Sequence, residues 1–250
     1  MRTSLILSFT LLFNIAAHAQ DSSLETNIKA ALESELRTEA ERERDRNRKP
    51  LKTLEFLGIT PDMRVLELIP GGGWYTKILA PTLRDEGELT VSLFATRVKE
   101  NIMGQEGMDK IKILEPKVEV TSGEDNLRTI SDAFEFGDTG FDAVLTFRNV
   151  HNFDAAGRKN INDAVFKALK PGGIYGVVDH TRRHMEPITS ENRRRADPVE
   201  IIKELLDAGF EFDGYSDLHR KPDDELRFEV GRKSVTGNSD RFTFVFKKPK

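Results

Sequence analysis

The sequence predicts an α/β fold in which helices cover both faces of a mostly parallel sheet. Three observations support this prediction. From residue 64 onward, short apolar segments alternate with segments of helical spacing, a pattern typical of a parallel sheet. A glycine-rich turn directly follows the first apolar segment. The chain closes on two strand-like segments with no helix between them, which predicts a final antiparallel pair.

The expected strands are short runs rich in apolar and β-branched residues. They lie at 64–69, 88–94, 118–123, 141–147, 173–181, 210–218 and 240–249. The expected helices carry apolar residues at helical spacing, at 74–83, 161–169 and 198–210. Parallel neighbours need a crossover connection, and these helices supply it.

The composition fits a globular protein of 250 residues. Hydrophobic residues make up 38% and charged residues 32%, so we expect a core beneath a highly charged surface. The formal net charge of -4 gives no overall attraction to nucleic acid, and no such partner is expected. The chain has no cysteine, which excludes a thiol nucleophile and a cysteine metal site.

Residues 1–19 have the features of a secretory signal peptide. One positive charge precedes the apolar run LILSFTLLFNIAA, and AHA at 17–19 fits a small-x-small cleavage site. We therefore expect cleavage after Ala19 and an exported protein, periplasmic or secreted. The alternative is an N-terminal membrane anchor, although the run is short for a bilayer span. No later segment has the pattern of a span, so no stable membrane insertion is expected after cleavage.

Residues 20–50 form an expected N-terminal helical segment ahead of the α/β domain at 51–250. Leu24, Ile28 and Leu32 fall at helical spacing, and the stretch TEAERERDRNRK that follows is dense in charges of both signs. We interpret the charged part as a solvated helix face with pairs four residues apart. Pro50 ends the segment.

Gly71, Gly72 and Gly73 stand between the first strand and the next helix. A bare turn needs one or two glycines, and each glycine is entropically costly. Glycines at this place let the backbone approach a ligand, and the helix start offers unpaired N–H groups. The alternative is a tight turn without a ligand. A dinucleotide motif requires glycine where the chain has Thr76, which disfavours a nicotinamide-dependent reductase.

Three motifs in order carry a family resemblance: PGGGWY at 70–75, RNVHN at 148–152 and KPGG at 170–173. The chain resembles the class I S-adenosylmethionine (SAM) dependent methyltransferases, and is most similar to an exported bacterial group of predicted methyltransferases with the PGGGWY motif. The resemblance implies a Rossmann-like, seven-stranded sheet of order 3-2-1-4-5-7-6 with strand 7 antiparallel. It also implies a SAM site across the carboxyl ends of strands 1, 2 and 4.

The resemblance assigns cofactor contacts around the glycines. Glu67 matches the acidic residue that orients the amino-acid end of SAM. Gly71 and Gly73 match two of the three family glycines, and Gly72 lies between them. Tyr75 opens the following helix, so we expect it near the cofactor.

Strand 2 departs from the family pattern. Most members hold the ribose hydroxyls with an acid about 20 residues beyond the glycines, which here points to Leu93. The local sequence VSLFAT has no carboxylate, and Ser92 offers a single hydrogen bond. Losing a charge-assisted pair of bonds costs on the order of 1.5–3 kcal/mol. Glu124 matches an acid near the adenine, with a solvated turn as the alternative.

Polar residues follow the fourth and fifth expected strands, where open α/β sheets bind ligands. Arg148 and Asn149 are candidates for contact with the methionine carboxylate or a substrate, and helix capping is the alternative. The catalytic candidates are His151, His180 and Asp179, because a neutral imidazole can take a proton from the attacking nucleophile. Their spacing matches no metal-ligand signature.

The expected function is methyl transfer from SAM to an unidentified small molecule. The rival is a non-enzymatic protein of the cell envelope that keeps the fold, has lost SAM binding and binds another ligand or partner. The missing strand 2 acid and the expected export both favour this rival. The arginines at 193–195 are interpreted as a charged surface turn, with binding of an anionic substrate as the alternative.

Overall fold

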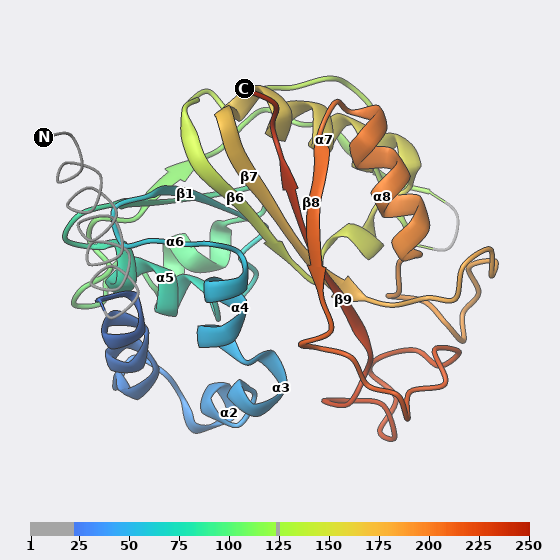
Figure 1. The fold of residues 1–250 in the computed structure, drawn as a ribbon, viewed down its shortest axis with the longest axis horizontal. Helices are drawn as coiled ribbons and strands as arrows, with labels where there is room; N and C mark the ends of the chain where they lie inside the picture. Colours follow the sequence, from blue (N-terminus) through green and yellow to red (C-terminus); the bar gives the residue numbers. More distant parts are fainter. Residues whose placement is uncertain (1–22, 124–125) are drawn as a thin grey trace, which may run out of the picture.

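A seven-stranded sheet forms the centre of the molecule in a computed structural model that describes residues 23–123 and 126–250. The strand order is β3-β2-β1-β6-β7-β9-β8 (Figure 1). The bounds are β1 Arg64–Leu68, β2 Glu88–Ser92, β3 Lys112–Leu114, β6 Phe141–Phe147, β7 Leu169–His180, β8 Glu211–Ser216 and β9 Arg241–Lys247. Only β9 runs antiparallel to both of its neighbours. Counted along this sheet, the order is 3-2-1-4-5-7-6, as predicted.

Helices pack on both faces of the sheet, which confirms the predicted fold class. The described helices are 23–33, α2 Glu39–Arg42, α3 Asp45–Arg48, α4 Pro50–Phe56, α5 Thr76–Leu83, α6 Thr96–Asn101, η2 Val150–Asn152, α7 Ala155–Ala168 and α8 Pro198–Asp207. One apolar core joins the sheet to 23–33, α4, α5 and α6. The other joins it to α7 and α8. None of the helices within the described ranges has the length and apolarity needed to cross a membrane.

Two elements differ from the sequence-based expectation. The third strand of the sheet is β3, whereas the expected strand at 118–123 forms β4 (Val120–Ser122), which pairs with β5 (Arg128–Ile130) in a separate hairpin. The side chains of β4 are largely exposed, so this short strand adds little to the apolar core. Pro50 begins helix α4 as well as ending the segment before it, because its fixed φ suits a first helical position.

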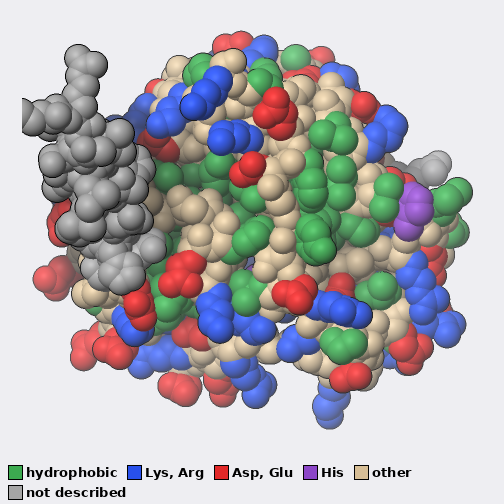
Figure 2. All heavy atoms as spheres, viewed as in Figure 1, with side chains coloured by type: hydrophobic (Ala, Val, Ile, Leu, Met, Phe, Trp, Pro, Cys, Tyr) green, Lys and Arg blue, Asp and Glu red, His purple; other side chains and the backbone are tan. Residues whose placement is uncertain are grey.

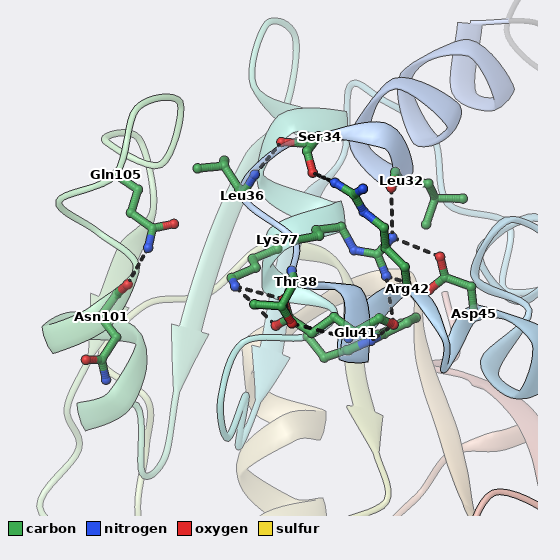
Figure 3. Close-up of polar contacts among 12 residues, drawn as sticks. Leu32, Ser34, Leu36, Thr38, Glu41, Arg42, Asp45, Lys77, Asn101 and Gln105 are labelled. Carbon is green, nitrogen blue, oxygen red and sulfur yellow. Dashed lines mark hydrogen bonds and ion pairs between the residues drawn. The ribbon is translucent and has the colours of Figure 1, made fainter.

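The charged N-terminal segment packs on the protein, so its interpretation as a solvated face was wrong in part. Trp74 Nε1 donates to the carbonyl of Glu41 at 2.9 Å. Lys77 Nζ lies 3.1 Å from both carboxylate oxygens of Glu41 (Figure 3). Buried Arg37 binds Asp45 through two hydrogen bonds, at 2.9 and 2.5 Å. The contacts of Glu41 tie α2 to the start of α5, and Arg37 ties α3 to the chain before α2.

The surface carries charges of both signs. Figure 2 shows acidic and basic side chains interspersed on one face, with hydrophobic side chains between them. This mixture agrees with the small net charge of -4 and presents no single-sign face in this view.

Candidate functional site

The carboxyl ends of the parallel strands β1, β2, β6 and β7 lie side by side at one end of the strands, which we call the rim. The glycine loop follows β1 at this rim, and the RNVHN segment follows β6. Asp179 and His180 are the last residues of β7. The structure therefore brings together the polar residues selected from three separate parts of the sequence. Glu124 lies outside the described residues.

The glycines of the loop have different structural requirements. Gly71 and Gly73 have φ angles of 58° and 75°, which favour glycine. A Cβ on Gly73 would lie 2.0 Å from Ile102 Cδ1, whereas a Cβ on Gly72 would have no atom of another residue within 4 Å apart from its chain neighbours. Gly73 is thus constrained by its φ angle, and a side chain there would also displace Ile102. Gly72 leaves room for close approach by a ligand.

Glu67 is held beneath this loop by the side chain that breaks the dinucleotide motif. Thr76 Oγ1 donates to Glu67 Oε2 at 2.6 Å, and both side chains are buried. Burial raises the pKa of Glu67 to about 7, while the Thr76 hydrogen bond and the charge of Arg48 oppose the rise. The sequence motif identified Thr76 as a departure but gave no sign of this role.

The end of β2 presents an aromatic side chain at the rim. Ser92 is buried, and its Oγ donates to the Leu114 carbonyl of β3 at 2.8 Å. Leu93 packs in the apolar core, so the counting rule pointed to a side chain that is turned away from solvent. Phe94 is 40% exposed, and the Arg128 guanidinium lies 5.2 Å from its ring centre. Sequence reasoning missed Phe94.

Arg148 and Asn149 connect neighbouring strand ends. Arg148 has a φ of 67° and its Nε donates to His180 Nε2 at 2.9 Å. Asn149 Nδ2 lies 3.3 Å from the carbonyls of Leu68 and Ile69. Asn149 therefore fixes the beginning of the glycine loop relative to β6.

His151 and Asp179 form a buried pair. His151 Nδ1 lies 2.5 Å from Asp179 Oδ1, and the His151 backbone N–H donates to Asp179 Oδ2 at 3.2 Å. Because the carboxylate accepts, Nδ1 carries the proton of a neutral His151, and Nε2 keeps its lone pair. This is the arrangement of an oriented general base.

His180 has both ring nitrogens engaged. Arg148 donates to Nε2, so Nδ1 carries the proton and donates to Ser239 Oγ at 2.8 Å. Burial lowers the pKa of His180 well below its ordinary value, and Arg148 adds to the effect. The geometry therefore suits His180 to positioning Arg148, and His151 to moving a proton.

A cavity of about 350 Å³ adjoins His151. Its lining includes Asn126, Asn152 and the arginines at 193–195. Arg195 is committed to Asp224 through two bonds of 2.9 Å, and Arg194 contacts Glu229. A second cavity, of about 320 Å³, lies away from the rim, at the amino ends of β2 and β3. Its lining includes Gly87, Glu88 and Lys112. Across the described part of the chain, no three metal-ligating carboxylate or imidazole groups cluster.

Known proteins share parts of this sequence and its fold. No family model matches the chain. An uncharacterized methyltransferase of Synechocystis sp. is 32% identical over 126 residues, which cover 50% of this chain and 51% of that protein. The matching region thus spans about half the length of this curated relative.

Solved structures match over most of the chain. A SAM-dependent methyltransferase from Aquifex aeolicus has a TM-score of 0.56 at 16% identity, covering 89% of this chain and 97% of that one. The glycopeptide N-methyltransferase MtfA with sinefungin scores 0.54 at 16% identity, covering 81% and 86%. The [4+2]-cyclase SpnF scores 0.53 at 15% identity, covering 91% and 93%. With its strand order, these likenesses show that the chain has the Rossmann-like fold of class I SAM-dependent methyltransferases.

Proposed function

We propose that the protein is a SAM-dependent methyltransferase acting on a small molecule. The observation that carries the proposal is the open Gly72 beside buried Glu67 at the end of β1, on the same rim as the His151–Asp179 pair. The Synechocystis relative is described as a methyltransferase. MtfA structures with sinefungin, S-adenosylhomocysteine and SAM have the same fold.

The residues at the rim fit such a cofactor. Glu67 offers a buried carboxylate whose pKa is raised by burial. A cationic partner, such as the ammonium group of SAM, would stabilise its charged form. The backbone of Gly71, Gly72 and Gly73 would pass around the cofactor. Tyr75 is buried directly before the first residue of α5. The other proposed cofactor contacts are Ser92, Glu124 and Asn149, and Arg148 is proposed to contact either the methionine carboxylate or the acceptor.

The ribose side of the site departs from the usual pattern. The hydroxyl of Ser92 already binds Leu114, so it would have to leave that carbonyl to reach a ribose. Exposed Phe94 at the end of β2 offers an aromatic surface in place of a carboxylate. We propose that stacking of the cofactor on the Phe94 ring replaces part of the contact that a carboxylate at the end of β2 would make.

SAM would supply a methyl group on a sulfonium. The chain would orient the acceptor and remove its proton. His151 Nε2 would take the proton from the acceptor, and the buried carboxylate of Asp179 would hold the ring and stabilise the imidazolium that forms. His180 would keep Arg148 in place.

Calorimetric titration of the purified protein with SAM and with S-adenosylhomocysteine tests the proposal. We expect binding of both, and transfer of label from methyl-labelled SAM to a small molecule in an extract of the host. SpnF shows that the fold also serves a protein described as a cyclase. A folded protein that binds neither ligand would contradict the proposal and favour the non-enzymatic alternative.

We also propose that the protein is exported, on the basis of the sequence of residues 1–19. Mass spectrometry of the native protein should find Gln20 at the N-terminus in a fraction outside the inner membrane. An intact Met1 in the cytoplasmic fraction would contradict this.

A further inference from the structure

Three arginines from distant parts of the chain meet beside Tyr75. Arg48 ends α3, Arg148 follows β6 and Arg241 begins β9. The Arg48 guanidinium carbon lies 4.3 Å from the ring centre of Trp74 and 5.9 Å from that of Tyr75.

Contacts through His180 and Asn47 connect the arginines to one another. Arg148 bonds to His180, and His180 is the cross-strand partner of Arg241. Arg241 Nη1 donates at 2.9 Å to the carbonyl of Asn47, the residue before Arg48. The three side chains therefore share one corner of the rim.

The fully buried arginines of the described chain outside this cluster are each paired with a carboxylate. Arg37 is paired with Asp45, Arg182 with Glu200 and Arg195 with Asp224. In the described ranges, neither Arg48, Arg148 nor Arg241 forms an ion pair with a carboxylate. Arg241 is only 7% exposed, and its buried Nε has no hydrogen-bond partner among the described residues.

Uncompensated buried cations are unfavourable. Burial, and after it the charge of Arg148, lowers the pKa of Arg48 to about 9 and that of Arg241 to about 10. Glu67 acts on Arg48, and Asp179 acts on both Arg148 and Arg241, but only from beyond ion-pair distance.

The remaining nearby acid, Asp240, is engaged elsewhere. Its side chain accepts from the Lys221 backbone N–H at 2.7 Å, and its charge acts on Arg241 less than those of Tyr75 and Asp179. The described chain thus brings three cations together and supplies no anion to pair with them.

We propose that Arg48, Arg148 and Arg241 bind an anionic group, carboxylate or phosphate, on the methyl acceptor. Assigning the anion to the acceptor rests on the proposed function. The sheet order puts β9 three strands from β1, a separation of about 14 Å. The strand that carries Arg241 therefore lies away from Glu67 and the glycine loop, where the amino-acid end of SAM is proposed to bind, whereas Arg48 packs against Trp74 and Tyr75 next to that loop. Guanidinium groups suit both carboxylate and phosphate.

Thermal melts and calorimetric titrations of the purified protein test this site with inorganic phosphate and with succinate, against sodium chloride at equal ionic strength. We expect at least one of these anions to raise the melting temperature beyond the chloride control. Arg241→Gln should weaken that binding at least about tenfold, as for loss of a charged hydrogen bond. Without anion it should melt no lower than the wild type.

Arg148→Gln serves as a second variant should Arg241→Gln not fold. Arg220→Gln, a change at an exposed arginine, is the matched control and should bind the anion like the wild type. Equal stabilisation of Arg241→Gln and wild type, or no stabilisation by either anion, would overturn the proposal.

Repeating the titration with saturating S-adenosylhomocysteine distinguishes the two sources of a carboxylate. Additive binding supports the acceptor, whereas competition would assign the arginines to the methionine carboxylate and overturn the acceptor assignment. Phosphate or succinate binding in a protein that does not bind S-adenosylhomocysteine would keep the anion site while the proposed function fails.

Discussion

His151 Nδ1 lies 2.5 Å from Asp179 Oδ1, and the Asp179 side chain is fully buried. This pairing fixes which imidazole nitrogen carries the proton. Loss of the Asp179 carboxylate should therefore affect both the His151 tautomer and the rate of methyl transfer.

Asp179→Asn should disturb the tautomer of His151 and slow methyl transfer about 10²–10⁴-fold, since the amide no longer holds an Nδ1 proton. SAM affinity should change little. Nitrogen-15 NMR of the histidine ring reports the tautomer, and single-turnover formation of S-adenosylhomocysteine reports the rate. Ser239→Ala perturbs His180 instead and should leave the His151 tautomer unchanged. An unaltered tautomer in Asp179→Asn would rule out the positioning role.

Glu67→Gln should stabilise the protein above neutral pH. The folded pKa of about 7 lies above the ordinary 4.5, so the protonated form favours folding. That contribution is complete below about 4.5 and is lost as pH rises through 7. Glutamine does not titrate. The unfolding free energy of the variant minus that of the wild type should therefore increase by up to about 3 kcal/mol from pH 4 to pH 8. Urea unfolding across this range is the measurement, and parallel curves for the two proteins would contradict the assignment.

Gly72→Val should fold normally and bind S-adenosylhomocysteine at least about tenfold more weakly, because a β-branched side chain would fill the space left for the ligand. Gly73→Val cannot test this, since it clashes with Ile102. Gly104→Val is the matched control: its added Cβ also meets no atom within 4 Å, but it lies after α6. Equal affinity in both valine variants would show that the loop is only a turn.

Acidic pH should weaken the hydrogen bonds that His219 makes with Arg48 and Thr243. Its Nε2 donates to the Arg48 carbonyl at 2.9 Å, and its Nδ1 accepts from Thr243 Oγ1 at 2.7 Å. Burial lowers the pKa of His219 to about 4 from 6.5, so the neutral form favours folding. That stability is present above 6.5 and is lost as pH falls toward 4.

The loss amounts to about 3 kcal/mol. His180 has a lowered pKa as well and adds to this loss in the wild type, whereas Glu67, with its raised pKa, acts in the opposite direction. His219→Gln should therefore lose less unfolding free energy than the wild type between pH 7 and pH 4. An unchanged slope between pH 7 and 4 would contradict the role assigned to His219.

Leu93→Asp should destabilise the protein by about 2–4 kcal/mol, because it buries a carboxylate among apolar side chains. Phe94→Asp at the exposed neighbouring position should cost less. Chemical denaturation of both variants compares them. A smaller loss for Leu93→Asp would mean that residue 93 reaches the rim.

Patterns within short stretches predicted the sheet well. Alternating apolar runs predicted the strands of the main sheet except β3, the family resemblance supplied the strand order, and the glycines marked the end of β1. The role of Thr76 escaped prediction because it depends on a contact with Glu67 across the strand-helix turn. The arginine cluster escaped because its members are separated by 93 residues or more in sequence and meet only when β9 pairs with β7. Such long-range contacts leave no local periodicity.

The bond from Trp74 to the Glu41 carbonyl makes the N-terminal segment part of the same cooperative structure as the glycine loop. Leu24 and Ile28 share an apolar core with Ile78 of α5. A proteolytic fragment starting at residue 51 would lose the partners of Trp74 and Lys77 together with Arg48. A change in this segment is therefore expected to be felt at the helix that follows the glycines, through Trp74 and Lys77.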